Sequence, residues 1–247
     1  MSGPESVNPS LGVSEGHRGQ SGSNLTQDSI RRLKLLQNRK GYRYSVDALM
    51  LADFVDKSRV RHCVDLGTGV GIVGLLIAER YPAARVTGIE IQKSMADLAE
   101  RNTTMNGLDS RVRMLHGDIR NVCEIIGEDC ADLVVSNPPF RKPCAGRLCS
   151  SEERRIARHE ICLSVDVLVT VAAGMLERGG SFCMIHLSER LSEILPTFSR
   201  HGIEAKRLRF IHAGMKQAAR LFVVEGVKGA RPGVRTEPPF ILPNRLT

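Results

Sequence analysis

The chain has 247 residues, of which 42% are hydrophobic and 25% charged, as is typical of a soluble globular protein with one core. No apolar run approaches membrane-spanning length and no secretory signal begins the chain, so a cytoplasmic location is expected. The net charge of +8 favours a polyanionic partner such as nucleic acid. Seven scattered cysteines match neither a disulfide framework nor a zinc site, and we expect no metal.

The first 26 residues are rich in Ser, Gly, Asn and Pro and have only isolated apolar side chains. Such a stretch buries too little apolar surface to offset the ordering of its backbone. We therefore expect a disordered tail over 1–26 and a single domain over 27–247. The domain should open with an N-terminal segment, 27–60, that contains a hairpin-like entry at 33–44 and a helix at 45–57.

From residue 61 onward, short apolar runs alternate with helical patterns. Strands that are apolar throughout are typical of a parallel sheet covered by helices on both faces. The expected strands lie at 61–67, 84–91, 111–118, 131–136 and 181–187, and the expected helices at 70–81, 92–107, 119–128 and 161–180.

The pattern changes after a further helix expected at 189–201. Two strands at 203–211 and 219–227 have only a loop between them, and such a loop cannot cross the sheet, so they should pair antiparallel. The fold class is therefore α/β and Rossmann-like: a seven-stranded, mostly parallel sheet with an antiparallel last strand and helices on both faces. This core covers 61–227, and the Pro-rich residues 228–247 should extend over the surface.

A glycine-rich loop follows the first strand of this core. Gly69, Gly71 and Gly74 match the dinucleotide fingerprint, which by itself can also be a turn that needs glycines. Asp65 ends the strand just before the loop. A carboxylate there would repel a pyrophosphate, but it could receive a cationic amine such as the methionine part of S-adenosylmethionine. The loop therefore favours S-adenosylmethionine over a dinucleotide.

Acidic residues end the first three strands of the core. Glu90 ends the second strand, where it could accept both ribose hydroxyls, and Asp118 follows the third, where it could bind the adenine amine. All three acids reach the carboxyl edge, where open α/β sheets bind ligands. Each could instead cap a helix, and for Asp118 that interpretation has equal weight.

The fourth strand ends in Asn137, Pro138, Pro139 and Phe140. An exocyclic amine is a poor nucleophile because its lone pair is delocalised. The Asn137 side-chain oxygen and the Pro138 carbonyl can each accept one N–H of such an amine, and the prolines hold both acceptors rigid. Phe140 can stack on a planar target. The alternative is a proline-rich turn with a core phenylalanine.

These residues resemble the class I S-adenosylmethionine-dependent amino-methyltransferases. "GYRYSVDALMLADF" at 41–54, "EERRIARHE" at 152–160 and "EGVKGARPG" at 225–233 narrow the resemblance to bacterial enzymes that N6-methylate the adenine beside the anticodon of a valine tRNA. The resemblance implies the class I methyltransferase fold and S-adenosyl-L-methionine as cofactor. It implies catalytic roles for Asn137, Pro138, Pro139 and Phe140, and cofactor contacts from Asp65, Gly67, Thr68, Gly69, Gly71, Glu90, Ile91, Asp118, Ile119 and Tyr44.

A basic insertion follows the fourth strand. Residues 141–160 have a net charge of +3, and we hypothesise that they form a flap that grips RNA phosphates near the target base. The alternative is a solvated helix with paired charges. The predicted substrate-binding side chains are Arg141, Lys142, Arg147, Arg154, Arg155 and Arg158.

The predicted function is S-adenosylmethionine-dependent N6-methylation of an adenine in tRNA. Methylation of a protein glutamine amide, methylation of guanine N2 in ribosomal RNA and non-catalytic RNA binding remain open. The glutamine-modifying family has a helical substrate domain before the catalytic one, and the ribosomal enzymes tend to have a duplicated domain that this chain is too short to hold.

Overall fold

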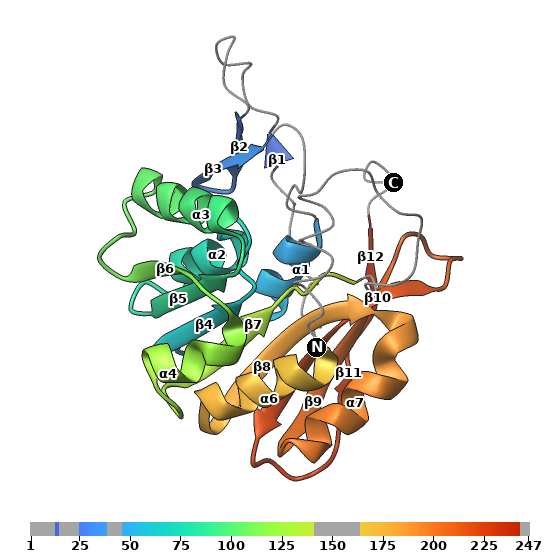
Figure 1. Ribbon diagram of the computed structural model, residues 1–247. Coiled ribbons are helices and arrows are strands. Elements are labelled where there is room, and N and C mark those ends of the chain that lie inside the picture. The colour runs from blue at the N-terminus through green and yellow to red at the C-terminus, as the bar shows by residue number, and fades with distance from the viewer. Residues whose placement is uncertain (1–12, 15–24, 39–45, 141–163, 243–247) are drawn as a thin grey trace, which may run out of the picture.

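A computed structural model describes residues 13–14, 25–38, 46–140 and 164–242. Its centre is a twisted sheet in the order β9-β10-β8-β7-β4-β5-β6, in which β10 alone runs antiparallel to its two neighbours (Figure 1). This confirms the predicted α/β fold with an antiparallel last long strand. The strands are β4 (His62–Leu66), β5 (Arg85–Glu90), β6 (Val112–His116), β7 (Ala131–Ser136), β8 (Leu176–Leu187), β9 (Ile203–His212) and β10 (Ala219–Lys228).

Helices cover both faces of the sheet because side chains of its strands alternate between two apolar clusters. Cys183 and Ile185 of β8 pack with one cluster, and Phe182 and Met184 with the other. The first cluster includes α1 (Val46–Phe54), α2 (Ile72–Arg80) and α3 (Lys93–Met105); the second includes α4 (Val122–Ile126), α6 (Val165–Met175) and α7 (Leu191–Arg200). Among the described helices none is long and apolar enough to cross a membrane.

The N-terminal hairpin lies earlier in the chain than the sequence pattern predicts. It consists of β2 (Leu25–Ile30) and β3 (Leu33–Asn38), and β1 (Val13–Ser14) pairs with β2. The predicted domain boundary therefore falls inside β2, and four residues of the expected tail, Val13, Ser14, Leu25 and Thr26, take part in a sheet. The apolar side chains of β3 that alternate inward hold the hairpin against the core, a tertiary contact that composition does not reveal.

The helix predicted at 161–180 ends earlier than expected. In its described part, α6 ends at Met175 and β8 begins at the next residue, so the two glycines expected to close the helix lie in a strand. The pairing of β8 with β7 shifts register near Leu133, as happens at a β-bulge. Apolar residues alone do not mark the change from helix to strand, because both elements are buried here.

The C-terminal segment adds strands to the sheet. β11 (Arg235–Thr236) and β12 (Phe240–Ile241) pair with the outer edge of β9, which brings the strand count from the predicted seven to nine. Short strands of this kind cover backbone groups that an open edge would leave unpaired. The sequence predicts that this segment extends over the surface. In the structure, strand pairing holds it at the edge of the sheet.

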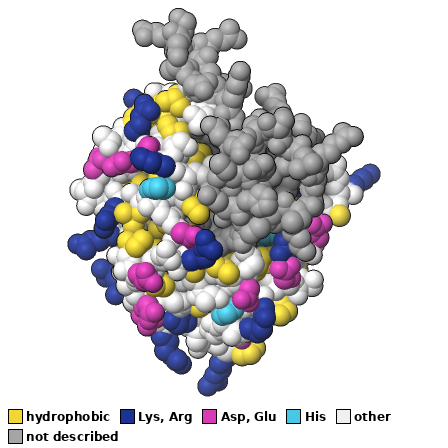
Figure 2. All heavy atoms as spheres, viewed as in Figure 1, with side chains coloured by type: hydrophobic (Ala, Val, Ile, Leu, Met, Phe, Trp, Pro, Cys, Tyr) yellow, Lys and Arg dark blue, Asp and Glu magenta, His cyan; other side chains and the backbone are white. Residues whose placement is uncertain are grey.

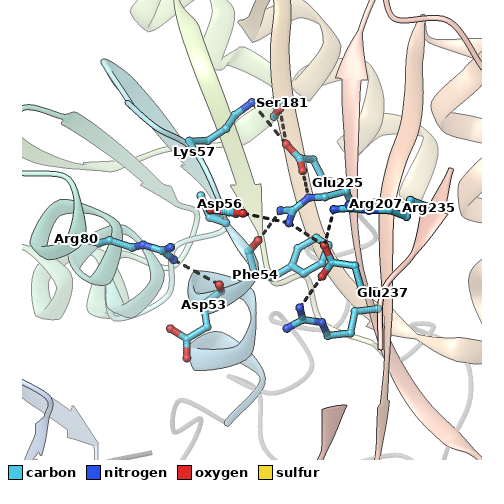
Figure 3. Close-up of polar contacts among 12 residues, drawn as sticks. Asp53, Phe54, Asp56, Lys57, Arg80, Ser181, Arg207, Glu225, Arg235 and Glu237 are labelled. Atoms are coloured by element: carbon cyan, nitrogen blue, oxygen red, sulfur yellow. Dashed lines mark hydrogen bonds and ion pairs between the residues drawn. The ribbon is translucent and has the colours of Figure 1, made fainter. Parts of the chain in front are cut away.

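An ion-pair network fastens this segment to the core (Figure 3). Arg207 of β9 donates to Glu225 of β10 (Nε to Oε2, 2.5 Å), to Glu237 (Nη1 to Oε1, 3.0 Å) and to the Phe54 carbonyl at the end of α1 (2.7 Å). Burial alone would raise the pKa of Glu225, but hydrogen bonds from Arg207 and Ser181 hold it below its ordinary value. The Arg207 guanidinium thus joins the end of α1, strands β9 and β10, and the C-terminal segment.

Replacing Arg207 with Met should lower the free energy of unfolding by about 3 kcal/mol, because Glu225 would then be buried with one partner fewer. Arg235→Met is the matched control. Arg235 also pairs with Glu237 but is 73% exposed, so its loss should cost under about 1 kcal/mol. Urea unfolding measures the free energy of unfolding of both variants. Equal losses in the two variants would show that Arg207 stabilises the protein no more than the exposed Arg235 does.

Candidate active site

The glycine loop turns sharply over the carboxyl ends of β4 and β5. Backbone N–H groups of Gly67 and Thr68 both donate to the Ile89 carbonyl, at 3.0 and 2.9 Å. Gly71 has φ of +90°, and a Cβ there would lie 3.0 Å from the Met114 methyl and 3.3 Å from Ala99 Cβ. A side chain at Gly71 would therefore strain the backbone and collide with the core, which accounts for a glycine at this position.

Asp65 is a buried carboxylate beneath this loop, with only 1% of its surface exposed. Its Oδ2 accepts hydrogen bonds from Thr68 Oγ1 (2.6 Å) and the Gly74 N–H (3.0 Å). Across the described residues its Oδ1 accepts none. Burial raises the pKa of Asp65 to about 6 and Glu90 adds to the rise, whereas the two hydrogen bonds oppose it. The structure thus provides a negative charge with one free oxygen.

Glu90 lies beside Asp65, because β4 and β5 pair in parallel with Leu66 opposite Ile89. Its Oε2 accepts the Gly69 N–H at 3.0 Å and its Oε1 accepts the Gln92 N–H at 2.9 Å. Burial raises the pKa of Glu90. Each oxygen keeps a second lone pair, so the carboxylate can still accept hydroxyl groups of a ligand. Ile91, half-buried, follows directly after it.

Asp118 has the geometry of a helix cap. Its Oδ1 accepts the Arg120 N–H at 2.9 Å at the start of the short 3-10 helix η1 (Ile119–Asn121), and its Oδ2 accepts Arg120 Nε at 2.8 Å. The Arg120 hydrogen bond lowers the pKa of Asp118. Ile119 packs in the second apolar cluster. Asp118 thus caps η1, as the alternative interpretation predicts. A contact between Asp118 and a cofactor stays a prediction.

Asn102 of α3 is a positioning residue that the sequence analysis missed. It is fully buried, and its Nδ2 donates to the Val70 carbonyl in the glycine loop at 2.9 Å. The same side chain pairs with both backbone groups of Leu36 in β3, through Oδ1 at 2.7 Å and Nδ2 at 3.1 Å. Asn102 therefore ties the loop to the N-terminal hairpin. A polar residue on the buried face of an otherwise amphipathic helix is the signal that could have identified it.

Asn137 and Pro138 follow directly after β7. This strand pairs with β4 on the side opposite to β5. Ser136 Oγ donates to the Leu66 carbonyl at 2.8 Å and so holds the end of β7 against β4. Asn137 and Pro138 are half-buried and Pro139 is exposed. Over the described ranges, neither the Asn137 side chain nor the Pro138 carbonyl has a hydrogen-bond partner. Both predicted acceptors therefore lie at the sheet edge without a partner among the described residues.

Phe140 packs against His186, which the sequence analysis also missed. The two ring centroids lie 5.5 Å apart, and His186 is 2% exposed near the end of β8. Burial, with the charge of Arg190 in addition, lowers the pKa of His186 to about 4, so the ring is neutral near pH 7. A polar residue at the end of an apolar strand, the signal that identified the three acids, also marks His186.

The structure brings the predicted residues of four strand ends to one edge of the sheet. The buried anion Asp65 lies one strand away from Asn137 and Pro138. Asp65 Oδ1 and the acceptors of Asn137 and Pro138 have no hydrogen-bond partner in the part of the chain that the structure describes. Such an arrangement can bind a cationic ligand beside an N–H donor. The remaining predicted residues lie outside the described ranges: Tyr44, Arg141, Lys142, Arg147, Arg154, Arg155 and Arg158.

Solved structures with the same fold include a predicted O-methyltransferase from Agrobacterium tumefaciens. It has a TM-score of 0.64 and 22% identity, over 79% of this chain and 86% of that one. P. horikoshii TYW2 in complex with MeSAdo has a TM-score of 0.59 and 18% identity, over 85% of this chain and 74% of that one. At these identities the likeness shows the fold alone.

Similarity in sequence identifies the family more closely than the shared fold does. The methyltransferase small domain model matches residues 45–195. A tRNA1(Val) (adenine(37)-N6)-methyltransferase of Porphyromonas gingivalis is 31% identical over 73% of this chain and 72% of its own length. A protein of the same name from Phocaeicola vulgatus is 27% identical over 74% and 76%. With both predicted acceptors and the buried Asp65 at the sheet edge, the chain belongs to the methyltransferase small domain family, among the relatives named tRNA1(Val) (adenine(37)-N6)-methyltransferase.

Proposed function

We propose that this enzyme transfers a methyl group from S-adenosylmethionine to the N6 amine of an adenine in tRNA. One observation carries the proposal: the buried Asp65 lies one strand from Asn137 and Pro138, and among the described residues its Oδ1 and their acceptors have no hydrogen-bond partner. The names of the relatives at 27–31% identity support adenine in tRNA as the substrate.

The residues at the ends of β4 and β5 fit the cofactor. S-adenosylmethionine, when bound, supplies an electrophilic methyl group next to a cationic sulfur. Asp65 Oδ1 would accept the α-amine of its methionine part, the backbone of Gly67 and Gly69 would let it approach the strand ends closely, and Glu90 would accept its ribose hydroxyls. A carboxylate that stays buried without a cationic partner is unfavourable, so binding of the amine would relieve the cost of its burial.

Asn137 and Pro138 would orient the target amine. The Asn137 side-chain oxygen and the Pro138 carbonyl would each accept one N–H, which localises the lone pair of the nitrogen and aims it away from both acceptors. The neighbouring prolines limit backbone freedom, so the acceptors need little reorganisation. Phe140, held on one side by His186, would contact the planar base. A base reaches such a pocket only when it is taken out of its stack.

Incubation with methyl-labelled S-adenosylmethionine and separate pools of unmodified tRNA, ribosomal RNA and protein tests this function. We expect label in tRNA, recovered as N6-methyladenosine after digestion to nucleosides. Fully modified tRNA from the native host is the matched control and should accept little label. Label in methylated glutamine or in methylated guanine, or none in tRNA, would overturn the assignment.

A further inference from the structure

Charge is unevenly divided along the described chain. Residues 46–140, which hold the cofactor side of the site, contain ten Lys and Arg against fourteen Asp and Glu, a net charge of −4. Residues 203–242, which form β9 to β12, contain eight Lys and Arg against three Asp and Glu, a net charge of +5. The positive charge of the described protein is therefore concentrated in the C-terminal strands.

Half of these eight positive charges form ion pairs with acids of the described chain. Arg207, Arg209 and Arg235 pair with Glu237, and Lys228 pairs with Asp129. Lys216, Arg220 and Arg231 are exposed, and no acid of the described chain pairs with any of them. Of these three, Lys216 and Arg220 lie at the hairpin between β9 and β10. Unpaired surface cations of this kind are available to an external anion.

Lys216 and Arg220 lie at the same sheet edge as Asn137. β9 runs parallel to β8 and β7, so the hairpin that leads from β9 to β10 emerges at their carboxyl ends. The hairpin projects from the molecule in Figure 1, and Met215 at its tip is 86% exposed. In Figure 2, viewed from the same side, Lys or Arg, hydrophobic and Asp or Glu side chains lie at that margin.

The register places Arg220 two strands away from Asn137, at the same edge of the sheet. The pairing of β10 with β9 is irregular between Ala219 and Leu221, and Leu221 lies opposite Leu187 of β8. A bulge re-aims the side chain that it contains. β7 is the next strand after β8, so Arg220 lies two strand spacings, or roughly 10 Å, across the sheet from the line of β7, which ends just before Asn137. By the strand registers it also lies about three residues, or roughly 10 Å, farther along the strands than Asn137. An arginine side chain can span roughly half of that separation.

We propose that Lys216 and Arg220 bind phosphates of the RNA strand that carries the target base. This inference rests on the proposed RNA substrate. Phosphate contacts fix the register of a nucleic acid on a protein without reading its sequence, which is what a base presented to Asn137 requires. The surface consists of described residues and does not include the insertion at 141–160.

The double variant Lys216→Gln/Arg220→Gln tests the proposal, with Arg59→Gln/Arg85→Gln as matched control. Arg59 and Arg85 are also exposed, form no described ion pair, and lie at the opposite, amino edge of the sheet. We expect the first variant to bind unmodified tRNA roughly tenfold more weakly near physiological salt, and its slope of log affinity against log salt to fall by about 1.5. The KM for tRNA should rise with it, while kcat and cofactor affinity stay near the wild-type values.

Three outcomes are distinguishable. Weaker tRNA binding in the first variant and not in the control supports the surface. Equal affinities in both variants, or equal losses, overturn the surface while wild-type turnover on tRNA leaves the proposed function intact. A wild-type protein that neither binds nor methylates RNA overturns the proposed function itself, and the surface with it.

Discussion

Replacing Asn137 with Ala should reduce turnover on tRNA by about 100- to 1000-fold, while the dissociation constant for S-adenosylmethionine changes only a few-fold. The reason is that its side-chain oxygen acts on the target amine, and a preorganised electrostatic contact at a reacting group contributes this much. The cofactor residues lie on neighbouring strands and remain in place. Single-turnover kinetics and isothermal titration measure the two quantities separately.

Asn38→Ala is the control for general effects of removing an asparagine side chain. Asn38 lies at the end of β3, in the N-terminal hairpin, and its side chain has no hydrogen bond with another described residue. That variant should retain wild-type turnover. If Asn137→Ala also turned over at the wild-type rate, Asn137 would have no part in the reaction.

Replacing Asp65 with Asn should have opposite effects on cofactor affinity and on stability. Loss of the negative charge removes a charge-assisted hydrogen bond to the cofactor amine, which should weaken S-adenosylmethionine binding about 10- to 100-fold. The unliganded variant should nonetheless be more stable at pH 7. Asparagine keeps an oxygen for the Thr68 and Gly74 hydrogen bonds without a buried charge.

The pKa of Asp65 sets the sign and the pH range of the stability effect. The pKa of the carboxyl rises from 3.8 in the unfolded chain to about 6 on folding, so above pH 6 folding buries an ionised group that water would solvate better. Each pKa unit corresponds to about 1.4 kcal/mol, so the cost at pH 7 is at most about 3 kcal/mol. As the pH falls from 7 toward 4, the folded protein takes up the proton first and this cost disappears.

Thermal unfolding of the cofactor-free proteins between pH 4 and pH 8 measures this difference. The stability of Asp65→Asn should exceed that of wild type most above pH 6, and the two should converge toward pH 4. Asp97→Asn, a change at an exposed residue of α3, should alter stability by less than about 0.5 kcal/mol at any pH in this range. A constant offset between Asp65→Asn and wild type would contradict the role of ionisation.

The sheet and its functional edge followed from local patterns in the sequence. Apolar strands alternating with helical periodicity predict a parallel sheet, and in such a sheet the carboxyl ends of the strands meet at one edge. That is why Asp65, Glu90 and Asn137 could be brought together before any contact was known. The antiparallel last long strand also followed, because its connecting loop is too short to cross the sheet.

Contacts between distant parts of the chain were not predictable in the same way. Asn102 and Leu36 are 66 residues apart, and Phe140 and His186 are 46 apart, yet each pair is in contact. Periodicity indicates which face of an element is buried, but it does not indicate which partner lies against that face. The pairing of β11 and β12 with β9 and the early end of α6 were missed for the same reason.

The amino-acid sequence by itself therefore determined the order of strands and helices and the chemistry available at one edge of the sheet. Only the tertiary structure decided the state of those groups: the burial that raises the pKa of Asp65 and the Arg120 partner that occupies Asp118. It also decided that Lys216 and Arg220 reach the same sheet edge without an acidic partner among the described residues. Local patterns encode secondary structure because they act over a few residues. Burial, pairing and charge balance depend on neighbours in space, which folding alone supplies.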